Sequence, residues 1–296
     1  MEFSLPEFFI FCGSTILIAM LLMEVLDWSC LMASLDCPEA KAVAQPFLYG
    51  DASGVESWSC AYPEARGREQ SPINIVTREA TVLAPAKPLK WQGYRDEPLG
   101  ASLLNDGNTV VLFGFWSCGT RPQLSGGPLS CAYEFRSAAF RWGPSDDEGS
   151  EHSLDYVRYP MELQVLHAKP GLECKARDSL AIVSYFFQIT NVDNPYLDHV
   201  VQNLWRITSP GANYHVPAFP LEWLFPSFER RYYSYSGSLT QPPCSQVATW
   251  IIQPEPLAIS TAQMAKFRQI CSVEGPILSN SRPVQKLNDR EVFYYA

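Results

Sequence analysis

The sequence predicts a mainly β protein, and three observations lead to this fold class. The 296 residues include 24 prolines and 13% aromatic residues, a composition that fits a loop-rich β protein better than a helical bundle. Hydrophobic residues make up 47% of the chain, which is enough for a full core. Short runs of branched and aromatic residues recur between Gly, Pro, Asn and Asp, as is typical of strands. No internal repeat or low-complexity linker divides residues 46–296, so one domain is the simplest interpretation.

Residues 1–45 are predicted to be a separate N-terminal segment and linker. Residues 8–23 form an apolar run that is short for a membrane span and close to the length of a signal core. Acidic residues flank the run, and the first basic residue is Lys41, which fits neither a signal nor an anchor well. Two interpretations stay open. A signal or anchor makes the protein secretory or membrane-associated through residues 8–23, and an appendage of other origin leaves it cytoplasmic.

The strand and helix signals follow one another along the rest of the chain. Turn residues at 105–108 separate two of the strand-like runs, and polar loops bound the others. Strands are expected at residues 102–104, 109–113, 133–142, 161–167 and 180–189. A surface helix is expected at residues 194–205, and a second helix at 259–267 with Ser260 or Thr261 as its N-cap.

The two central runs, residues 133–142 and 161–167, organise the candidate site. Side chains alternate along a strand, so Ala139 and Arg141 share one face of the first run. Gln164 lies on one face of the second run, together with the residues two positions before and after it. If the two runs lie side by side, Ala139, Arg141 and Gln164 converge at the base of one cavity.

Several motifs around these runs are similar to those of one enzyme family. They are Arg68-Glu-Gln-Ser-Pro72, Ser125-Gly-Gly-Pro128, Trp142-Gly143, Gly149-Ser-Glu-His152, Glu162-Leu163 and Ser238-Leu-Thr-Gln-Pro-Pro243. Together they resemble the α-type carbonic anhydrases, over residues 47–292. The resemblance implies a large central, mostly antiparallel twisted sheet of about ten strands with short peripheral helices. It also implies a cis peptide bond between Ser71 and Pro72.

The resemblance places the family's three zinc-binding histidines at Ala139, Arg141 and Gln164. None of these side chains can bind zinc in the family's way. A methyl group has no lone pair, a guanidinium has no acceptor and is positively charged, and an amide is a poor ligand beside imidazole. We therefore expect no metal and no other cofactor, and zinc only if this interpretation of the three positions is wrong.

Other positions of the family's site keep residues of the usual kind. In active members a threonine, oriented by a glutamate, directs the zinc-bound hydroxide, and Thr240 and Glu151 stand at these two positions. The proton-shuttle histidine is replaced by Asn108, which does not titrate near neutral pH. The residues that support the metal site correspond to His152, Glu162 and Tyr235. The apolar wall of the carbon dioxide pocket corresponds to Leu166, Ile182 and Leu239.

Buried carboxylates at Glu151 and Glu162 need partners, because an unpaired buried charge is costly. Arg141 offers one solution, since its guanidinium could fill the vacated space and pair with Glu162 or Glu151. The alternative is that Arg141 points outward to solvent along the cavity.

Three classes of function follow from these residues. The first is a catalytically silent member of the family that acts as a protein-binding or regulatory module with an unknown protein partner. The second is an active zinc carbonic anhydrase, hydrating carbon dioxide at a non-standard metal site. The third is a metal-free esterase or small-molecule binder that uses Thr240. A net charge of −9 and the lack of a Lys/Arg run disfavour nucleic acid as a partner.

The nine cysteines are an odd number, so at least one is free or paired between chains. Secreted members of the family join a cysteine before the Gln-Ser-Pro motif to one after the Thr-x-Pro-Pro motif. Cys244 stands at the second place, whereas the first holds Ala65, so Cys60 would have to take that role. The pairing stays open at this point.

Overall fold

The computed structural model describes residue 49 and residues 52–296, with the exception of 172–175. The predicted boundary between residues 45 and 46 and the apolar run at 8–23 lie outside the described residues. Within the described part of the chain, no helix combines the length and the apolar character that crossing a membrane requires.

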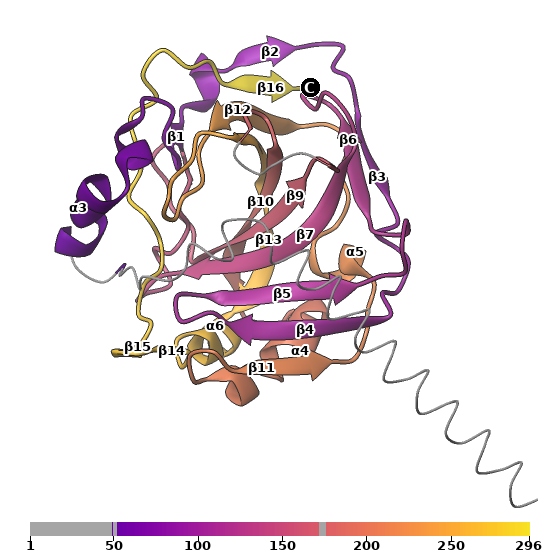
Figure 1. The fold of residues 1–296 in the computed structure, drawn as a ribbon, viewed down its shortest axis with the longest axis vertical. Coiled ribbons are helices and arrows are strands. Elements are labelled where there is room, and N and C mark those ends of the chain that lie inside the picture. The colour runs from indigo at the N-terminus through magenta and orange to yellow at the C-terminus, as the bar shows by residue number, and fades with distance from the viewer. Residues whose placement is uncertain (1–48, 50–51, 172–175) are drawn as a thin grey trace, which may run out of the picture. The chain divides into compact units, whose positions relative to one another are not determined.

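A mixed, mostly antiparallel sheet of twelve strands forms the body of the domain (Figure 1). The predicted fold class is confirmed, and the sheet is slightly larger than expected. Two pairs of neighbours are parallel, β10 with β13 and β16 with β2. The strands of this sheet are β2 Thr81–Leu83, β3 Leu89–Gln92, β4 Gly100–Asn105, β5 Val110–Phe115, β6 Gln123–Gly126, β7 Tyr133–Trp142, β9 Met161–Ala168, β10 Leu180–Thr190, β11 Asn213–Val216, β12 Tyr232–Gly237, β13 Ala248–Ser260 and β16 Phe293–Tyr295.

Smaller elements surround this sheet. Two short pairs of strands lie outside it, β1 (Asn74–Ile75) with β8 (Ser153–Leu154), and β14 (Cys271–Ser272) with β15 (Gly275–Pro276). The helical elements are α3 Ala52–Ala61, η1 Pro63–Arg66, η2 Thr77–Glu79, η3 Pro195–Leu197, α4 Asp198–Val201, η4 Leu204–Ile207, α5 Leu221–Leu224 and α6 Thr261–Phe267.

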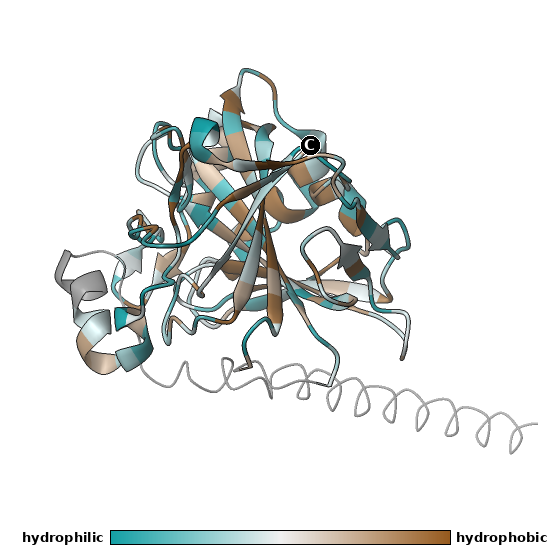
Figure 2. Cartoon of the chain, turned by 90° about the horizontal axis from the view of Figure 1, so that it is seen from above, coloured by the Kyte–Doolittle hydropathy of each residue, from teal (hydrophilic) through white to brown (hydrophobic). Residues whose placement is uncertain are grey.

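The two faces of the central strands β7, β9 and β10 have different partners. Phe140 and Trp142 of β7 and Leu163 of β9 are fully buried in one large apolar cluster, which also contains Phe267 of α6. Ile182 of β10 belongs to a second apolar cluster. Successive side chains of a strand point to opposite faces. Because the two faces have different surroundings, hydrophobic and hydrophilic residues are interspersed along the strands (Figure 2). Burying one large apolar side chain contributes about 1.5–3 kcal/mol, so the first cluster fixes which face of β7 carries the polar residues.

The two predicted helices have different outcomes. The second one is confirmed, because α6 begins after Ser260, whose side chain caps the helix in a reciprocal arrangement with Gln263. The prediction for residues 194–205 is wrong in its extent, because the regular helix is limited to α4 and 3-10 turns flank it. The Asn203 side chain donates a hydrogen bond to the carbonyl of His199 (3.0 Å). Such local side-chain bonds compete with continued helix.

Two further expectations concern covalent geometry. The Ser71–Pro72 peptide bond is cis, as the resemblance implies. Cys60 is an exposed free thiol and Cys244 a buried one, so the structure does not pair them.

Candidate functional site

Strands β7 and β9 bring the three central residues together. In the antiparallel register Ala139 lies opposite Gln164, and Arg141 lies opposite Glu162. Ala139 and Arg141 are two residues apart on β7 and therefore share a face. The Arg141 Nε donates a hydrogen bond to Gln164 Oε1 at 3.3 Å. The predicted proximity of Arg141 and Gln164 is therefore confirmed, and Ala139 lies opposite Gln164 in the register.

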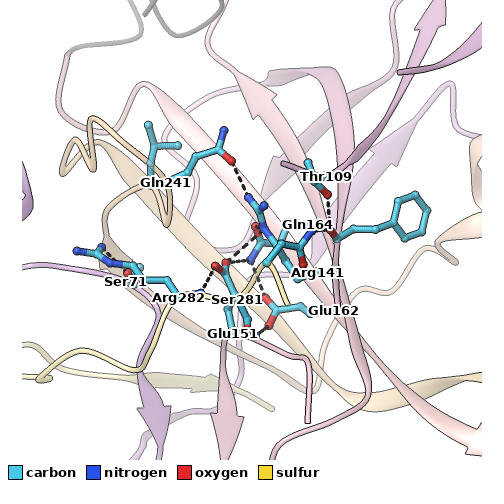
Figure 3. A network of polar contacts seen from close by, with 12 residues as sticks. Ser71, Thr109, Arg141, Glu151, Glu162, Gln164, Gln241, Ser281 and Arg282 are labelled. Carbon is cyan, nitrogen blue, oxygen red and sulfur yellow. Dashed lines mark hydrogen bonds and ion pairs between the residues drawn. The ribbon is translucent and has the colours of Figure 1, made fainter. Parts of the chain in front are cut away.

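Arg141 is buried at the centre of a polar network (Figure 3). Its Nε lies 3.6 Å from the Glu151 Oε2 atom, an ion pair in which both side chains are almost fully buried. Its two terminal nitrogens donate hydrogen bonds to Tyr49 Oη (3.2 Å) and Gln241 Oε1 (2.9 Å). Of the two interpretations of Arg141, the structure bears out pairing with a carboxylate rather than extension into solvent.

The Gln164 amide uses its donor and acceptor sides for different partners. Its Nε2 donates to Glu151 Oε2 at 2.6 Å and to Glu162 Oε1 at 3.0 Å. Its carbonyl oxygen faces the Arg141 guanidinium. An amide has two N–H donors and a carbonyl acceptor, so Gln164 can bridge two carboxylates and a cation at once.

The Glu162 carboxylate has five hydrogen-bond donors around it. Oε1 accepts from His152 Nδ1 (2.9 Å), Gln164 Nε2 (3.0 Å) and Ser184 Oγ (2.8 Å). Oε2 accepts from the backbone N–H groups of Glu151 and His152, both at 2.9 Å. Burial alone would raise the pKa of Glu162, but the charge and hydrogen bond of His152, together with the other donors, lower it from 4.5 to about 2. Glu162 is therefore a fixed buried anion.

The Glu151 carboxylate is the second buried anion of the site. Its Oε1 accepts a hydrogen bond from the backbone N–H of Arg282 at 2.9 Å, and its Oε2 faces Gln164 and Arg141. Thr240 is also buried, at 3% exposure. No hydrogen bond between described residues joins the Thr240 hydroxyl to Glu151.

His152 links Glu162 to a chain of hydroxyl groups. Its Nε2 lies 2.7 Å from the Tyr235 hydroxyl, which donates a hydrogen bond to Ser71 Oγ at 2.9 Å. The chain ties β9 to β12 and to the segment that contains the cis Ser71–Pro72 bond. His152, Glu162 and Tyr235 thus form a connected structural network.

The remaining predicted positions lie around this network. Leu166 and Ile182 are opposite each other in the β9–β10 register, and Leu239 belongs to the same apolar cluster. Asn108 lies in the turn between β4 and β5. Its N–H donates to Asp106 Oδ1 at 2.8 Å, and its carbonyl accepts from Asn280 Nδ2 at 3.1 Å. The first contact is local to the turn, and the second joins the turn to the distant segment that contains Asn280.

Sequence reasoning missed three residues that complete the site. Tyr49 and Gln241 accept hydrogen bonds from Arg141, and Arg282 supplies a backbone donor to Glu151. The position of Gln241 next to Thr240 was the only local signal for any of the three. The contacts of Tyr49 and Arg282 depend on segments far apart in the chain.

The donor set at the three central positions does not fit zinc. A zinc site needs three or four N, S or carboxylate ligands with available lone pairs, and Ala139 and Arg141 supply none. Gln164 has one amide oxygen, and it faces the cation of Arg141. Among the described residues, no group of three or more His, Cys, Asp or Glu side chains has the geometry to hold a metal ion.

Comparisons with known proteins agree with the fold and the motifs. Residues 53–296 match the eukaryotic-type carbonic anhydrases. The chain is 33% identical over 260 residues to carbonic anhydrase 3 of Homo sapiens, covering 84% of this chain and 98% of the human protein. It is 34% identical over 255 residues to human carbonic anhydrase 7, covering 82% of this chain and 95% of that protein.

The chain belongs to the α-carbonic anhydrase family. Membership is established over residues 53–296, the part of the chain that carries the site. In this member of the α-carbonic anhydrase family, Arg141 pairs with Glu151, and Gln164 donates hydrogen bonds to both Glu151 and Glu162.

Proposed function

We propose that this α-carbonic anhydrase is catalytically silent and acts as a protein-binding or regulatory module. One observation carries the proposal. The Arg141 guanidinium pairs with Glu151 at 3.6 Å, where both side chains are shielded from water, and the resemblance assigns position 141 to one of the family's zinc ligands.

The chemistry of the family depends on zinc, which lowers the pKa of a bound water so that hydroxide forms near neutral pH. The residues at the three ligand positions do not fit that ion, because two of them offer it no lone pair. Asn108 adds a second loss, because an amide cannot relay protons as imidazole does. The retained residues Thr240, Glu151 and Glu162 have no reagent to orient.

Charge balance supports the same conclusion. Glu151 and Glu162 are fully buried, and a buried anion is tolerated only where cations and hydrogen-bond donors surround it. Arg141 supplies a cation beside Glu151, and Gln164 donates to both carboxylates. The arginine and the glutamine thereby fill structural roles that a zinc–histidine centre would otherwise serve.

The competing function is zinc-dependent hydration of carbon dioxide at a non-standard site. Such a site would draw its imidazole ligands from the four histidines of the chain. Each of these histidines lies in a different part of the fold, and the two buried ones have hydrogen-bond partners. His152 contacts Glu162 and Tyr235, and His167 contacts Tyr94 and the carbonyl of Ala181. The others are His199, whose ring stacks on Phe219, and His215 on β11.

Equilibrium dialysis against zinc tests the proposal. The wild-type protein is compared with a variant that restores the family's ligands, Ala139→His, Arg141→His and Gln164→His. We expect no stoichiometric zinc in the wild type and about one zinc per chain in the triple variant, because three imidazoles complete a tetrahedral site with water. One tightly bound zinc per wild-type chain would contradict the proposal.

A further inference from the structure

We infer that the free edge of β11, together with Arg206, binds an extended acidic segment of a partner protein by strand addition. This inference rests on the proposed binding role and names the surface and the kind of partner. It concerns Asn213–Val216, Trp205, Arg206 and Tyr214, which lie apart from the network around Arg141.

The first observation is the open edge of the sheet. Strand β11 pairs with β4 on one side and is the last strand of the sheet (Figure 1). No described residue forms a backbone hydrogen bond to its other side beyond those of the β4–β11 ladder. Asn213 and His215 of this strand are exposed. An open edge presents unpaired N–H and C=O groups, which an extended chain can satisfy.

The second observation is a rigid arginine beside this edge. The Arg206 guanidinium carbon lies 4.3 Å from the centre of the Trp205 ring and 4.4 Å from the centre of the Tyr214 ring. Tyr214 is part of β11, so the cation is held next to the edge itself. Neither an ion pair nor a hydrogen bond connects the guanidinium to any described residue. Its five donors remain available, and stacking on two rings reduces the entropy lost when they bind.

These observations favour an acidic, extended occupant. Carboxylates match the planar fork of a guanidinium, so an Asp or Glu side chain is the natural partner of Arg206. The Trp205 side chain, 66% exposed, adds an apolar surface for a neighbouring residue of the same segment. β11 has only four residues, so it offers few backbone hydrogen bonds, and the side-chain contacts must supply most of the affinity. The net charge of −9 opposes any acidic partner at long range, so the attraction is local to Arg206.

A library of short random peptides, displayed on phage and selected on the wild-type protein, tests this inference. Selected peptides are synthesised, and their dissociation constants are measured for wild type, Arg206→Gln and Arg230→Gln. Arg230 is the matched control, because it is also exposed and unpaired among the described residues but has no ring contact. We expect peptides enriched in Asp or Glu, with affinity reduced about ten- to a hundredfold by Arg206→Gln and unchanged by Arg230→Gln. Peptides without acidic enrichment, or with equal affinity for both variants, would overturn the inference.

Hydrogen exchange of the same complexes tests the strand addition. Bound peptide should slow the exchange of backbone amides in Asn213–Val216. The opposite edge strand β2 (Thr81–Leu83) serves as the control, because it also pairs on one side only. Protection at β2, or none at β11, would contradict the assignment. Concentration-dependent self-association that Arg206→Gln abolishes would instead identify a second copy of this chain as the occupant, and would overturn the proposal of a partner segment.

These outcomes are independent of the zinc measurement. If wild-type protein binds zinc, the proposed function fails whatever the peptides do. If peptides ignore Arg206 while zinc stays absent, only the inference about β11 fails.

Discussion

Replacing Arg141 with alanine should destabilise the domain far more than replacing a surface arginine. The substitution removes a buried cation from beside Glu151 and deletes hydrogen bonds to Gln164, Tyr49 and Gln241. The Glu151 carboxylate, which is fully buried, would then keep its contacts with Gln164 and Arg282 but lose its counter-charge.

The magnitude follows from the geometry. At the 3.6 Å separation of Arg141 Nε and Glu151 Oε2, and with an effective dielectric constant of about 20, the Coulomb attraction is about 5 kcal/mol. Breaking one side of a buried pair costs about 3–5 kcal/mol in measured cases, because the remaining charge is stranded. We expect a loss of about 3–5 kcal/mol in the free energy of unfolding.

Urea unfolding at equilibrium measures this loss. Arg68→Ala is the control, because Arg68 pairs with Asp289 at 2.9 Å while both side chains are largely exposed, at 76% and 90%. Such surface pairs contribute about 0–1 kcal/mol. Adding Glu151→Gln to Arg141→Ala should recover part of the loss, since the stranded charge disappears. If Arg141→Ala and Arg68→Ala unfold at the same urea concentration as wild type, the pairing of Arg141 with Glu151 contributes nothing and our reasoning is refuted.

Two further predictions concern pH and are checked by unfolding the protein across a pH series. In the folded state the pKa of Glu162 is lowered from 4.5 to about 2, so the unfolded chain binds this proton at a higher pH than the folded protein does. The stabilisation from Glu162 is therefore fully present above pH 4.5 and is lost as the pH falls toward 2. In Glu162→Gln the free energy of unfolding should fall less steeply over this range. Burial lowers the pKa of His167 from 6.5 to about 4, so the free energy of unfolding should decline as the pH falls from 6.5 to 4. In His167→Phe the free energy of unfolding should depend less on pH between 6.5 and 4, and its slope below pH 4 should remain. If the free energy of unfolding of Glu162→Gln falls as steeply as that of wild type below pH 4.5, groups other than Glu162 control that range. If His167→Phe keeps the wild-type slope between pH 4 and 6.5, groups other than His167 control that range.

The central part of the site was predictable from the sequence because it depends on strand alternation. Ala139 and Arg141 are two residues apart on a strand with a strong apolar face, so their side chains must emerge together. The partner strand supplies Gln164 through a register that the fully buried Leu163 and Val165 constrain. The convergence of the three residues therefore follows from two local patterns.

The surroundings of Arg141 were not predictable in the same way. Its contacts with Tyr49 and Gln241 join segments 92 and 100 residues away along the chain. The periodicity of a strand does not indicate which distant loop will contact its side chains. The partners of Glu151 are unpredictable for a related reason, because Gln164 and Arg141 both contact its Oε2 atom and the backbone N–H of the distant Arg282 binds its Oε1 atom.

The size of the sheet and the break in the predicted surface helix reflect tertiary context. Edge strands such as β2 and β11 have three and four residues, too few for a periodic pattern to stand out. In residues 194–205, 3-10 turns flank a single turn of regular helix, and the side chain of Asn203 competes with its continuation. These differences between the predicted and the observed elements do not involve the central strands β7 and β9, which carry the site.

The rate of carbon dioxide hydration tests the central claim most directly. Purified wild-type protein and the triple histidine variant are supplied with zinc, and hydration is followed by stopped flow before and after treatment with a chelator. We predict no rate above the uncatalysed background for the wild type. For the variant we predict a modest, chelator-sensitive rate, because we propose that Asn108 replaces the family's proton shuttle. A chelator-sensitive rate from the wild-type protein itself would contradict the claim that this carbonic anhydrase is silent.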